Sequence, residues 1–237
     1  MDSPVARSGA PTRRRLLGTI AAGAGSMALA RYSLRARAGA SAAFIEPICK
    51  PAWGAQPPKG EFVTHRIERL TVHHSAVILH RNRDAPGEFR SHQAYHQSRG
   101  WPDIAYHMLI DRRGNVYRGR PSSARGDTGT TYDPTGHYLV LCEGNFSEQP
   151  ISKAQVRALV DVLAWASGRF DVPPRRIHGH RDFAATACPG TDLYRLIDSG
   201  VIERRVGDKL ATGGVKKKEL CGRAGRRRVA AIESGNA

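Results

Sequence analysis

Two clusters of histidine and one cysteine carry the strongest chemical signal in this sequence. His73 and His74 close a short β-branched segment, and the segment His178–His180 (His-Gly-His) comes shortly before Cys188. Imidazole nitrogen and thiolate sulfur are ligands that zinc prefers, and three protein ligands with one open position are typical of a catalytic zinc site. The spacing therefore predicts a His/His/Cys zinc site. The alternative is a buried structural Cys188 with two histidines at the surface.

Most of the other histidines lie in polar segments and need no special role. We expect solvated side chains at five of them, where water satisfies both ring nitrogens. These five are His65, His80, His92, His96 and His137.

Short apolar and β-branched runs predict the strands that must position the candidate ligands. One such strand ends at the histidine pair, and an alternating run followed by Arg113-Gly114-Asn115 predicts a hairpin. A continuous apolar run further on predicts a buried central strand. The expected strands are 69–74, 104–111, 116–118, 138–142 and 176–178.

The clearest predicted helix begins after Ser152, which forms a capping box with Gln155. Apolar residues then recur at helical spacing along one face, and we expect the helix to end at Gly168. Two further helices are expected, over 88–99 with Gly100 as a stop and over 191–197. Strands alternating with helices over about 160 residues indicate an α/β layer structure.

Composition excludes several classes of protein. The 237 residues are 40 % hydrophobic and 24 % charged, which are ordinary globular values and exclude a collagen-like chain, a disordered polymer and a coiled coil. The 37 Lys and Arg against 21 Asp and Glu give a net charge of +16. Residues 1–40 and 203–237 each carry +6, and the middle of the chain only +4. A nucleic-acid-binding domain would carry this charge on its folded part, so we expect no nucleic-acid partner.

The N-terminus resembles a twin-arginine export signal. Thr12–Leu17 (TRRRLL) places arginines before a moderately apolar, Ala/Gly-rich stretch that runs to Ala30, and small residues suited to cleavage follow near Ala38. The alternative is a short amphipathic helix with chance arginines. We expect residues 1–40 to be removed and the mature chain to lie in the periplasm or outside the cell, without stable membrane insertion.

The mature chain is then expected to have three parts. Residues 41–60 are rich in Pro and Gly and predict an irregular lead-in, residues 61–202 a single domain, and residues 203–237 a basic, flexible tail. On this view the tail attracts the protein to an anionic cell wall. Truncation after residue 212 should then spare the chemistry.

Six segments between residues 52 and 198 occur in an informative order. They are Trp53-Gly54-Ala55, Val72–Ala76, Gly100–His107, Gly144-Asn145-Phe146, His178–Asp182 and Cys188-Pro189-Gly190. Together they resemble the zinc-dependent N-acetylmuramoyl-L-alanine amidases, the family that includes peptidoglycan recognition proteins and phage lysozyme-type amidases. The resemblance implies a single α/β domain with a central mixed β-sheet flanked by helices and a zinc site in a surface groove.

The same resemblance implies roles for individual residues. The zinc ligands would be His73, His180 and Cys188. Tyr106 would be the catalytic tyrosine, and Thr186 would add a second hydrogen bond to the reacting carbonyl. The next residues along the two strands are also histidines. Because side chains alternate between the faces of a strand, we expect His74 and His107 to point away from the metal and the tyrosine.

The sequence departs from the family pattern at two places. Many relatives have Gly-Ala-His after the hairpin, where this chain has Arg125-Gly126-Asp127. Some intracellular relatives carry a water-activating Glu on the central strand, where this chain has Leu141. Glu143 lies two residues further on and so shares that face, but the role does not transfer to it. The identity of the general base is left open.

The implied activity is hydrolysis of the amide bond between N-acetylmuramic acid and L-alanine, with Zn²⁺ as cofactor and peptidoglycan or muropeptides as partners of a monomeric enzyme. A non-catalytic peptidoglycan-binding protein is the alternative, and it usually lacks the cysteine ligand. The presence of Cys188 favours the enzyme. A zinc peptidase is a third possibility, against which the amidase-like segment Trp101–Tyr106 argues.

The remaining cysteines fall into two groups. Cys142 lies in an apolar strand and is expected to be a buried free thiol. Cys49 and Cys221 lie in the two extensions, where an oxidising compartment would permit a disulfide and flexible segments would leave two free thiols.

Overall fold

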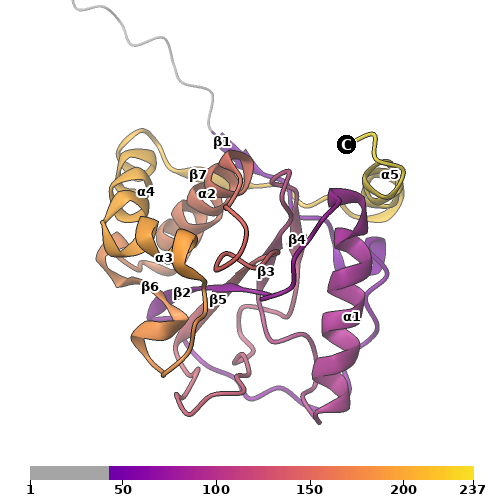
Figure 1. Cartoon of the computed structure of the whole chain (residues 1–237), viewed down its shortest axis with the longest axis horizontal. Coiled ribbons are helices and arrows are strands. Elements are labelled where there is room, and N and C mark those ends of the chain that lie inside the picture. Colours follow the sequence, from indigo (N-terminus) through magenta and orange to yellow (C-terminus); the bar gives the residue numbers. More distant parts are fainter. Residues whose placement is uncertain (1–42) are drawn as a thin grey trace, which may run out of the picture. The chain divides into compact units, whose positions relative to one another are not determined.

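A central β-sheet brings together segments that are far apart in the chain (Figure 1). The computed structural model describes residues 43–237, and the expected export signal over 1–40 lies outside them. The strands are β1 (Ala43–Ile45), β2 (Arg69–His74), β3 (Met108–Ile110), β4 (Val116–Arg118), β5 (His137–Cys142), β6 (Ile177–Gly179) and β7 (Val215–Lys217). The α-helices are α1 (Ala85–Ser98), α2 (Lys153–Phe170), α3 (Thr191–Asp198), α4 (Val201–Ala211) and α5 (Gly222–Glu233). Four 3₁₀ turns complete the elements: η1 (Lys50–Ala52), η2 (Asn82–Asp84), η3 (Pro174–Arg176) and η4 (His180–Asp182).

The central sheet has five strands in the order β4-β3-β5-β2-β6. β2 runs parallel to β5, with Arg69 opposite His137 and His74 opposite Cys142, and also parallel to β6. β3 and β4 form the expected antiparallel hairpin. The predicted mixed sheet is therefore confirmed. Its central strands are buried because helices cover both faces.

Alternation along the strands divides the core into two layers. Leu70 and Val72 of β2 pack with Val140 of β5 in the cluster that includes α2 and α4. Leu141 points to the other face and packs with residues of α1 and α5. His73 shares that second face by the period of two. The candidate ligand on β2 is thus directed away from the α2 layer.

Helix α2 forms as its sequence predicts, with one correction. The Ser152 hydroxyl accepts a hydrogen bond from Gln155 N at 3.0 Å, and the Ser152 backbone N–H donates one to Gln155 Oε1 at 3.4 Å. The helix continues beyond Gly168 to Phe170 and ends where Asp171 adopts a left-handed conformation, with φ of 56°. The prediction that Gly168 ends it was wrong, because Asp can also take the left-handed cap conformation.

The prediction of a flexible tail over 203–237 was also wrong. Residues 201–211 form α4, β7 pairs in parallel with β1, and α5 follows (Figure 1). Val229 and Ile232 of α5 are buried in the cluster that contains Trp53. These apolar residues are spaced three apart among charged ones, so overall composition hides an amphipathic helix. The lead-in over 41–60 is likewise tied down, by β1, η1 and the fully buried Trp53.

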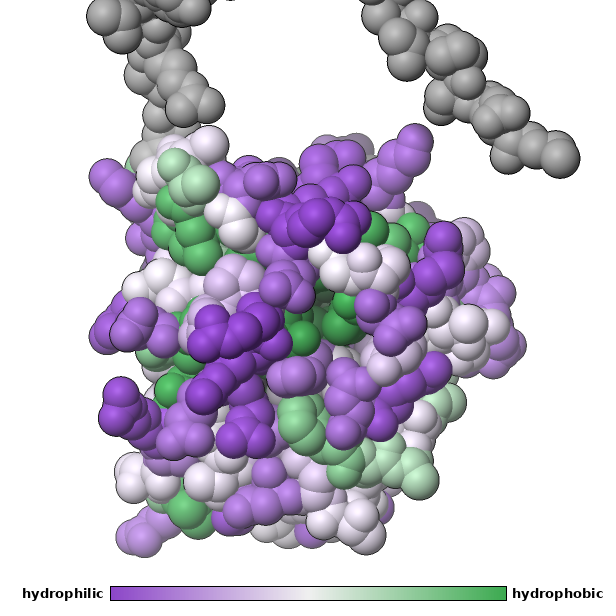
Figure 2. Space-filling model, turned by 90° about the vertical axis from the view of Figure 1, so that its left-hand side faces the viewer, coloured by the Kyte–Doolittle hydropathy of each residue, from purple (hydrophilic) through white to green (hydrophobic). Residues whose placement is uncertain are grey.

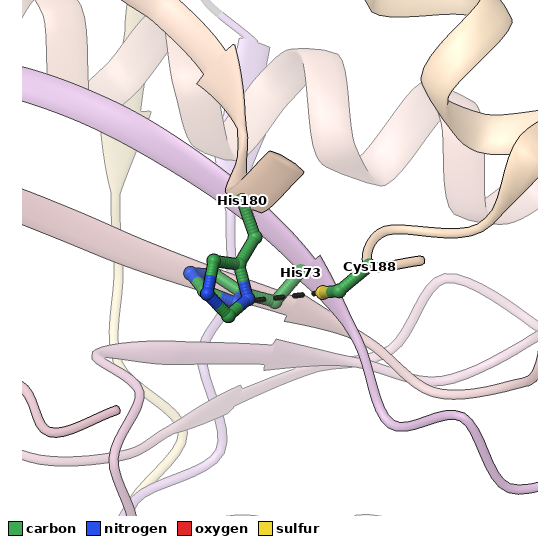
Figure 3. A group of neighbouring side chains, drawn as sticks. All are labelled: His73, His180 and Cys188. Carbon is green, nitrogen blue, oxygen red and sulfur yellow. Dashed lines mark hydrogen bonds between the residues drawn. The ribbon is translucent and has the colours of Figure 1, made fainter. Parts of the chain in front are cut away.

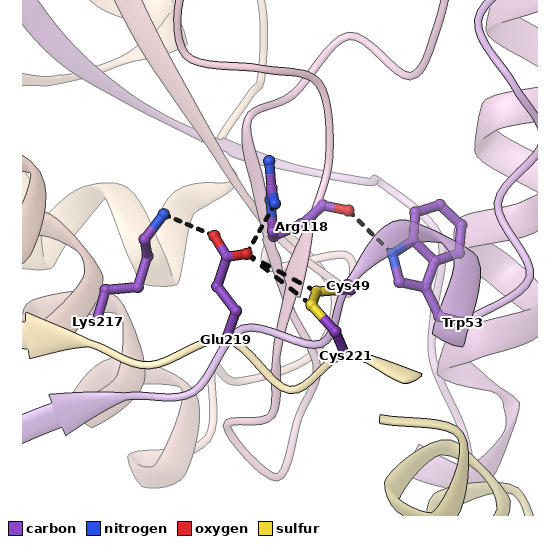
Figure 4. Close-up of a disulfide and its surroundings, with 6 residues drawn as sticks. All are labelled: Cys49, Trp53, Arg118, Lys217, Glu219 and Cys221. Carbon is purple, nitrogen blue, oxygen red and sulfur yellow. Dashed lines mark hydrogen bonds and ion pairs between the residues drawn. A yellow bond between two sulfur atoms is a disulfide. The ribbon is translucent and has the colours of Figure 1, made fainter. Parts of the chain in front are cut away.

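A disulfide joins the two extensions (Figure 4). Cys49 and Cys221 are 172 positions apart in the sequence, and their Cα atoms lie 5.0 Å apart. Glu219 beside them accepts hydrogen bonds from Arg118 at 2.9 Å and from Lys217 at 2.8 Å. Of the two arrangements that the sequence leaves open, the structure has the disulfide. Cys142 is a buried free thiol, as predicted.

The molecular surface around α3 and α4 is largely hydrophilic and carries only small apolar patches (Figure 2). Among residues 43–237, no helix combines the length and the apolar character that crossing a membrane requires.

Candidate metal centre and substrate cavity

The three predicted ligands lie together at the ends of neighbouring elements. His73 is the second-to-last residue of β2, His180 begins η4 directly after β6, and Cys188 lies on the loop before α3. One ligand atom of each residue lies within 4.8 Å of the other two. Figure 3 shows the two imidazoles side by side, with the Cys188 thiol directed at them. Residues more than 100 positions apart are thus brought together by the parallel pairing of β2 with β6.

The geometry of this cluster fits a zinc ion. With Zn–N and Zn–S bonds of about 2.0 and 2.3 Å, tetrahedral N and S ligands lie about 3.5 Å apart. His73 Nδ1 and Cys188 Sγ are 3.6 Å apart. The buried Nε2 of His73 has no hydrogen-bond partner among the described residues, so the fold alone does not satisfy this ring. Two imidazoles and one thiol are also the donor set of a catalytic zinc site.

Burial sets the protonation of the three groups. It lowers the pKa of His73 well below its usual value, assisted by the nearby His180, and lowers the pKa of His180 to about 4. Burial raises the pKa of Cys188 to about 12, against the opposing effects of the His74 N–H and the Arg181 charge. At neutral pH the free site therefore holds two neutral imidazoles, ready to bind, and a thiol that releases its proton when a metal binds.

Backbone and side-chain contacts hold the Cys188 loop. The His74 N–H donates to Cys188 Sγ at 3.4 Å, and the Cys188 N–H donates to the Thr186 hydroxyl at 3.2 Å. Gly190 has a φ of +87°, and a Cβ there would lie 2.6 Å from the backbone of Phe146. Thr186 thus supports the loop that carries the thiol. Its contact with a reacting carbonyl stays a prediction.

His74 and His107 point away from the centre, as predicted. His74 Nδ1 accepts a hydrogen bond from Phe146 N at 3.3 Å. The His107 ring bridges two backbones, because Nε2 lies 2.9 Å from Ala124 O and Nδ1 accepts from Leu139 N at 2.8 Å. Both are structural residues of the sheet and its loops.

Tyr106 stands beside the metal cluster. Its ring centroid lies 5.2 Å from that of His73. Burial, together with the Cys188 charge, raises the pKa of Tyr106 above its ordinary value, so the phenol keeps its proton. A Cβ at position 119 would lie 2.0 Å from the Tyr106 carbonyl oxygen, which explains the glycine there. The structure thus places a hydrogen-bond donor next to the cluster.

A cavity of about 270 Å³ opens over this cluster. His73, His180 and Tyr106 line one part of its wall, and Leu141 of β5 contributes to it. The rest comes from α1, from Trp101 and from the loop 127–129. The cavity is large enough for the reacting part of a substrate and leads directly to the metal cluster.

A family model described as N-acetylmuramoyl-L-alanine amidase matches residues 63–191, more than half of the chain. The chain belongs to this family. Peptidoglycan recognition protein 1 of Mus musculus is 32 % identical over 164 residues, which cover 67 % of this chain and 88 % of the mouse protein. The matched region includes every residue of the metal cluster.

Solved structures agree with this assignment. The Drosophila peptidoglycan recognition protein SD superposes with a TM-score of 0.60 at 28 % identity, over 65 % of this chain and 94 % of that one. Peptidoglycan recognition protein LE, solved in complex with tracheal cytotoxin (monomeric diaminopimelic acid-type peptidoglycan), gives a TM-score of 0.59 at 25 % identity, over 65 % and 92 %. The predicted family and fold are confirmed.

Within this amidase-family site, sequence reasoning missed the histidines of α1. His92 and His96 line the cavity, and His96 is buried, so the expectation of solvated side chains was wrong for both. His137 is also buried, where its Nδ1 pairs with the Thr71 hydroxyl at 2.8 Å. A spacing of four residues places His92 and His96 on one helix face, and this was the available signal.

The two departures from the family pattern both lie at the cavity. Asp127 pairs with the buried Arg120 at 2.7 Å and so fixes the loop that lines one wall. Leu141 is fully buried and offers no group that exchanges protons. Glu143 is fully buried too, and its carboxylate is bound by His92 and Ser75.

Proposed function

We propose that this protein is a zinc-dependent N-acetylmuramoyl-L-alanine amidase that hydrolyses the amide bond between N-acetylmuramic acid and L-alanine in peptidoglycan or muropeptides. The observation that carries the proposal is the complete His73/His180/Cys188 set, gathered at ligand distances beside a cavity. Family membership and the similarity to a protein solved with a muropeptide support the substrate class.

The three ligands would hold one Zn²⁺, which when bound polarises the scissile carbonyl and lowers the pKa of water towards about 7. Tyr106 then has a defined task. Its protonated phenol donates a hydrogen bond to the carbonyl oxygen, on which negative charge develops. Thr186 adds a weaker donor from the Cys188 loop. Both groups are neutral donors that need no change of charge to act.

A non-catalytic peptidoglycan-binding protein is the competing function. The cavity and the recognition-protein relatives suit both activities. The intact cysteine ligand beside His73 favours the enzyme, since binding of peptidoglycan alone requires no metal ligand.

The decisive experiment is mass spectrometry of purified peptidoglycan fragments after incubation with the zinc-loaded protein, with and without a chelator. The expected products are a free N-terminal L-alanine on the stem peptide and a lactyl carboxylate on the muramic acid. Binding of muropeptides without any such products would identify a recognition protein. Cleavage inside the stem peptide would identify a peptidase.

Two variants separate metal binding from support of the reacting oxygen. Cys188→Ser should lose zinc and activity together, because a hydroxyl binds zinc poorly. Tyr106→Phe should keep about one zinc per chain and bind substrate, while kcat falls roughly 10²–10³-fold. Thr186→Ala should cost less than Tyr106→Phe. A near-native kcat for a fully loaded Tyr106→Phe would make Tyr106 a packing residue.

We also propose export through the twin-arginine route, with residues 1–40 as the signal. The Cys49–Cys221 disulfide supports this, since such bonds persist in oxidising compartments. Replacing Arg13 and Arg14 with Lys should retain the chain in the cytoplasm, as measured by cell fractionation. Equal export of this variant would contradict the proposed route.

A further inference from the structure

A buried carboxylate holds one histidine in the wall of the cavity. Glu143 is fully buried at the end of β5, and one of its oxygens, Oε2, lies 3.0 Å from Nε2 of His92. The other, Oε1, accepts a hydrogen bond from the Ser75 hydroxyl at 2.8 Å. Both oxygens are therefore occupied, as the burial of a charge requires. His92 is tied to this carboxylate while its side chain stays 17 % exposed and lines the cavity.

This contact fixes which nitrogen of His92 is free. A carboxylate accepts hydrogen bonds, so Nε2 carries the proton that points at Glu143. In the neutral ring Nδ1 is then the acceptor, and it has no hydrogen-bond partner among the described residues. This nitrogen is not buried, so it is exposed to solvent. An imidazole that is oriented by a carboxylate, keeps its second nitrogen exposed and belongs to a cavity wall has the arrangement of a general base.

The other groups in the cavity wall are unsuited to this task. His96 Nδ1 accepts a hydrogen bond from Ala105 N at 3.1 Å, and burial lowers the pKa of His96 to about 3. Asp127 is paired with Arg120. Leu141 has no titratable group. His73 and His180 belong to the metal cluster and Tyr106 keeps its proton.

The charges around His92 favour proton uptake by its ring. Burial lowers its pKa, but the hydrogen bond and charge of Glu143 and the charge of Glu88 more than offset this, and the net pKa is raised. His96 on the same helix is neutral at neutral pH. A raised pKa makes the imidazole a stronger proton acceptor.

His92 and two of the three proposed metal ligands line the same cavity. The cavity has a volume of about 270 Å³. His92, His73 and Tyr106 all line it. The proposed base and the proposed metal site therefore face the same space.

We propose that His92, positioned by Glu143, is the proton-transfer residue of this site. The inference rests on the proposed amidase function. Nδ1 of His92 takes a proton from water as the water oxygen bonds to the amide carbonyl carbon. The same proton then passes to the alanine nitrogen as the C–N bond breaks. One amide and one water give a carboxylic acid and an amine, and His92 ends as it began.

The test compares zinc-loaded wild type with His92→Gln, Glu143→Gln and the control His80→Gln, which removes an exposed histidine outside the cavity. His92→Gln should lower kcat roughly 10²–10⁴-fold, with zinc content, melting temperature and muropeptide Kd near those of wild type. The kcat of wild type should rise with pH through the pKa of His92, because the base must be neutral. Glu143→Gln should move this limb to lower pH. His80→Gln should match wild type throughout.

A second measurement does not depend on activity. Nitrogen NMR of the imidazoles in zinc-loaded protein should show one histidine with its proton on Nε2 and a raised pKa. This signal should disappear in His92→Gln. In Glu143→Gln it should titrate at lower pH. Two results would overturn this inference alone. One is a His92→Gln variant with wild-type kcat. The other is a rise of kcat with pH that persists in His92→Gln and disappears in Asp127→Asn. A zinc-loaded wild type that cleaves no muropeptide would overturn the proposed function and this inference with it.

Discussion

The hydroxyl of Thr130 lies 2.8 Å from Nε2 of His180 and so fixes the orientation of that ligand. Thr130 itself is held by Thr128, whose hydroxyl lies 2.8 Å away. With Nε2 engaged, Nδ1 is the nitrogen that His180 has available for a metal. The polar loop after the hairpin supplies no metal ligand itself, but through Thr128 and Thr130 it supports the candidate ligand His180.

Thr130→Val is expected to weaken zinc binding without removing a ligand. The change keeps the shape of the side chain and deletes the partner of His180, and loss of such a supporting hydrogen bond typically costs 10–100-fold in metal affinity. Competition with a chromogenic chelator measures the affinity. Thr131→Val, at an exposed neighbour, is the matched control. Equal affinities of the two variants would show that Thr130 does not orient the ligand.

Loss of the Cys49–Cys221 disulfide should destabilise the fold. The bond closes a loop with a sequence separation of 172, and removing a native disulfide typically costs about 2–5 kcal/mol. Denaturant unfolding of Cys49→Ala/Cys221→Ala should show this loss, and reductant should have no further effect on the variant. Thiol counting of denatured, metal-free wild type should find two of the four cysteines free, Cys142 and Cys188. Four reactive thiols would contradict the disulfide.

The C-terminal helix should be necessary for stability. Ile232 is fully buried, and truncating such a side chain in Ile232→Ala should lower the free energy of unfolding by about 2–5 kcal/mol. Truncation after residue 212 should then impair wall binding and turnover together, contrary to the expectation from sequence. Arg227→Ala, on the exposed side of α5, should change stability by less than about 0.5 kcal/mol. Urea unfolding curves compare the three, and a fully stable truncated chain would refute the role of α5.

Acid should destabilise the protein through His107. Burial lowers the pKa of His107 to about 3 in the folded state, below its unfolded value of about 6.5. The unfolded state therefore takes up the proton first, and stability falls as pH falls from about 6.5 towards 3. At pH 5 this one group accounts for about 2 kcal/mol.

The measurement is the difference in unfolding free energy between pH 7 and pH 5. His107→Gln should reduce this difference relative to wild type, whatever its effect on stability at pH 7. His80→Gln removes an exposed histidine and should leave the difference unchanged. An unaltered difference in His107→Gln would assign the acid sensitivity to other groups.

Local signals in the sequence determined the elements and the ligand set. β-branched residues over 69–74, the Ser152–Gln155 capping box and the turn at 113–115 each act within a few residues, so the strand, the helix and the hairpin follow from them. The ligands His73, His180 and Cys188 were also identifiable, because residue type and order suffice for a metal set.

Only the tertiary structure decided what depends on contacts between distant segments. The 203–237 segment is basic by composition. It folds because the few apolar residues of α5 pack on Trp53 and α1. His92 lies 51 positions from Glu143, and nothing local marks their pairing. The pairing exists because the fold places the residue directly after β5 beside the side of α1 that lines the cavity. Such pairings change the protonation of a side chain, so the chemistry of this site follows from the fold as much as from its ligands.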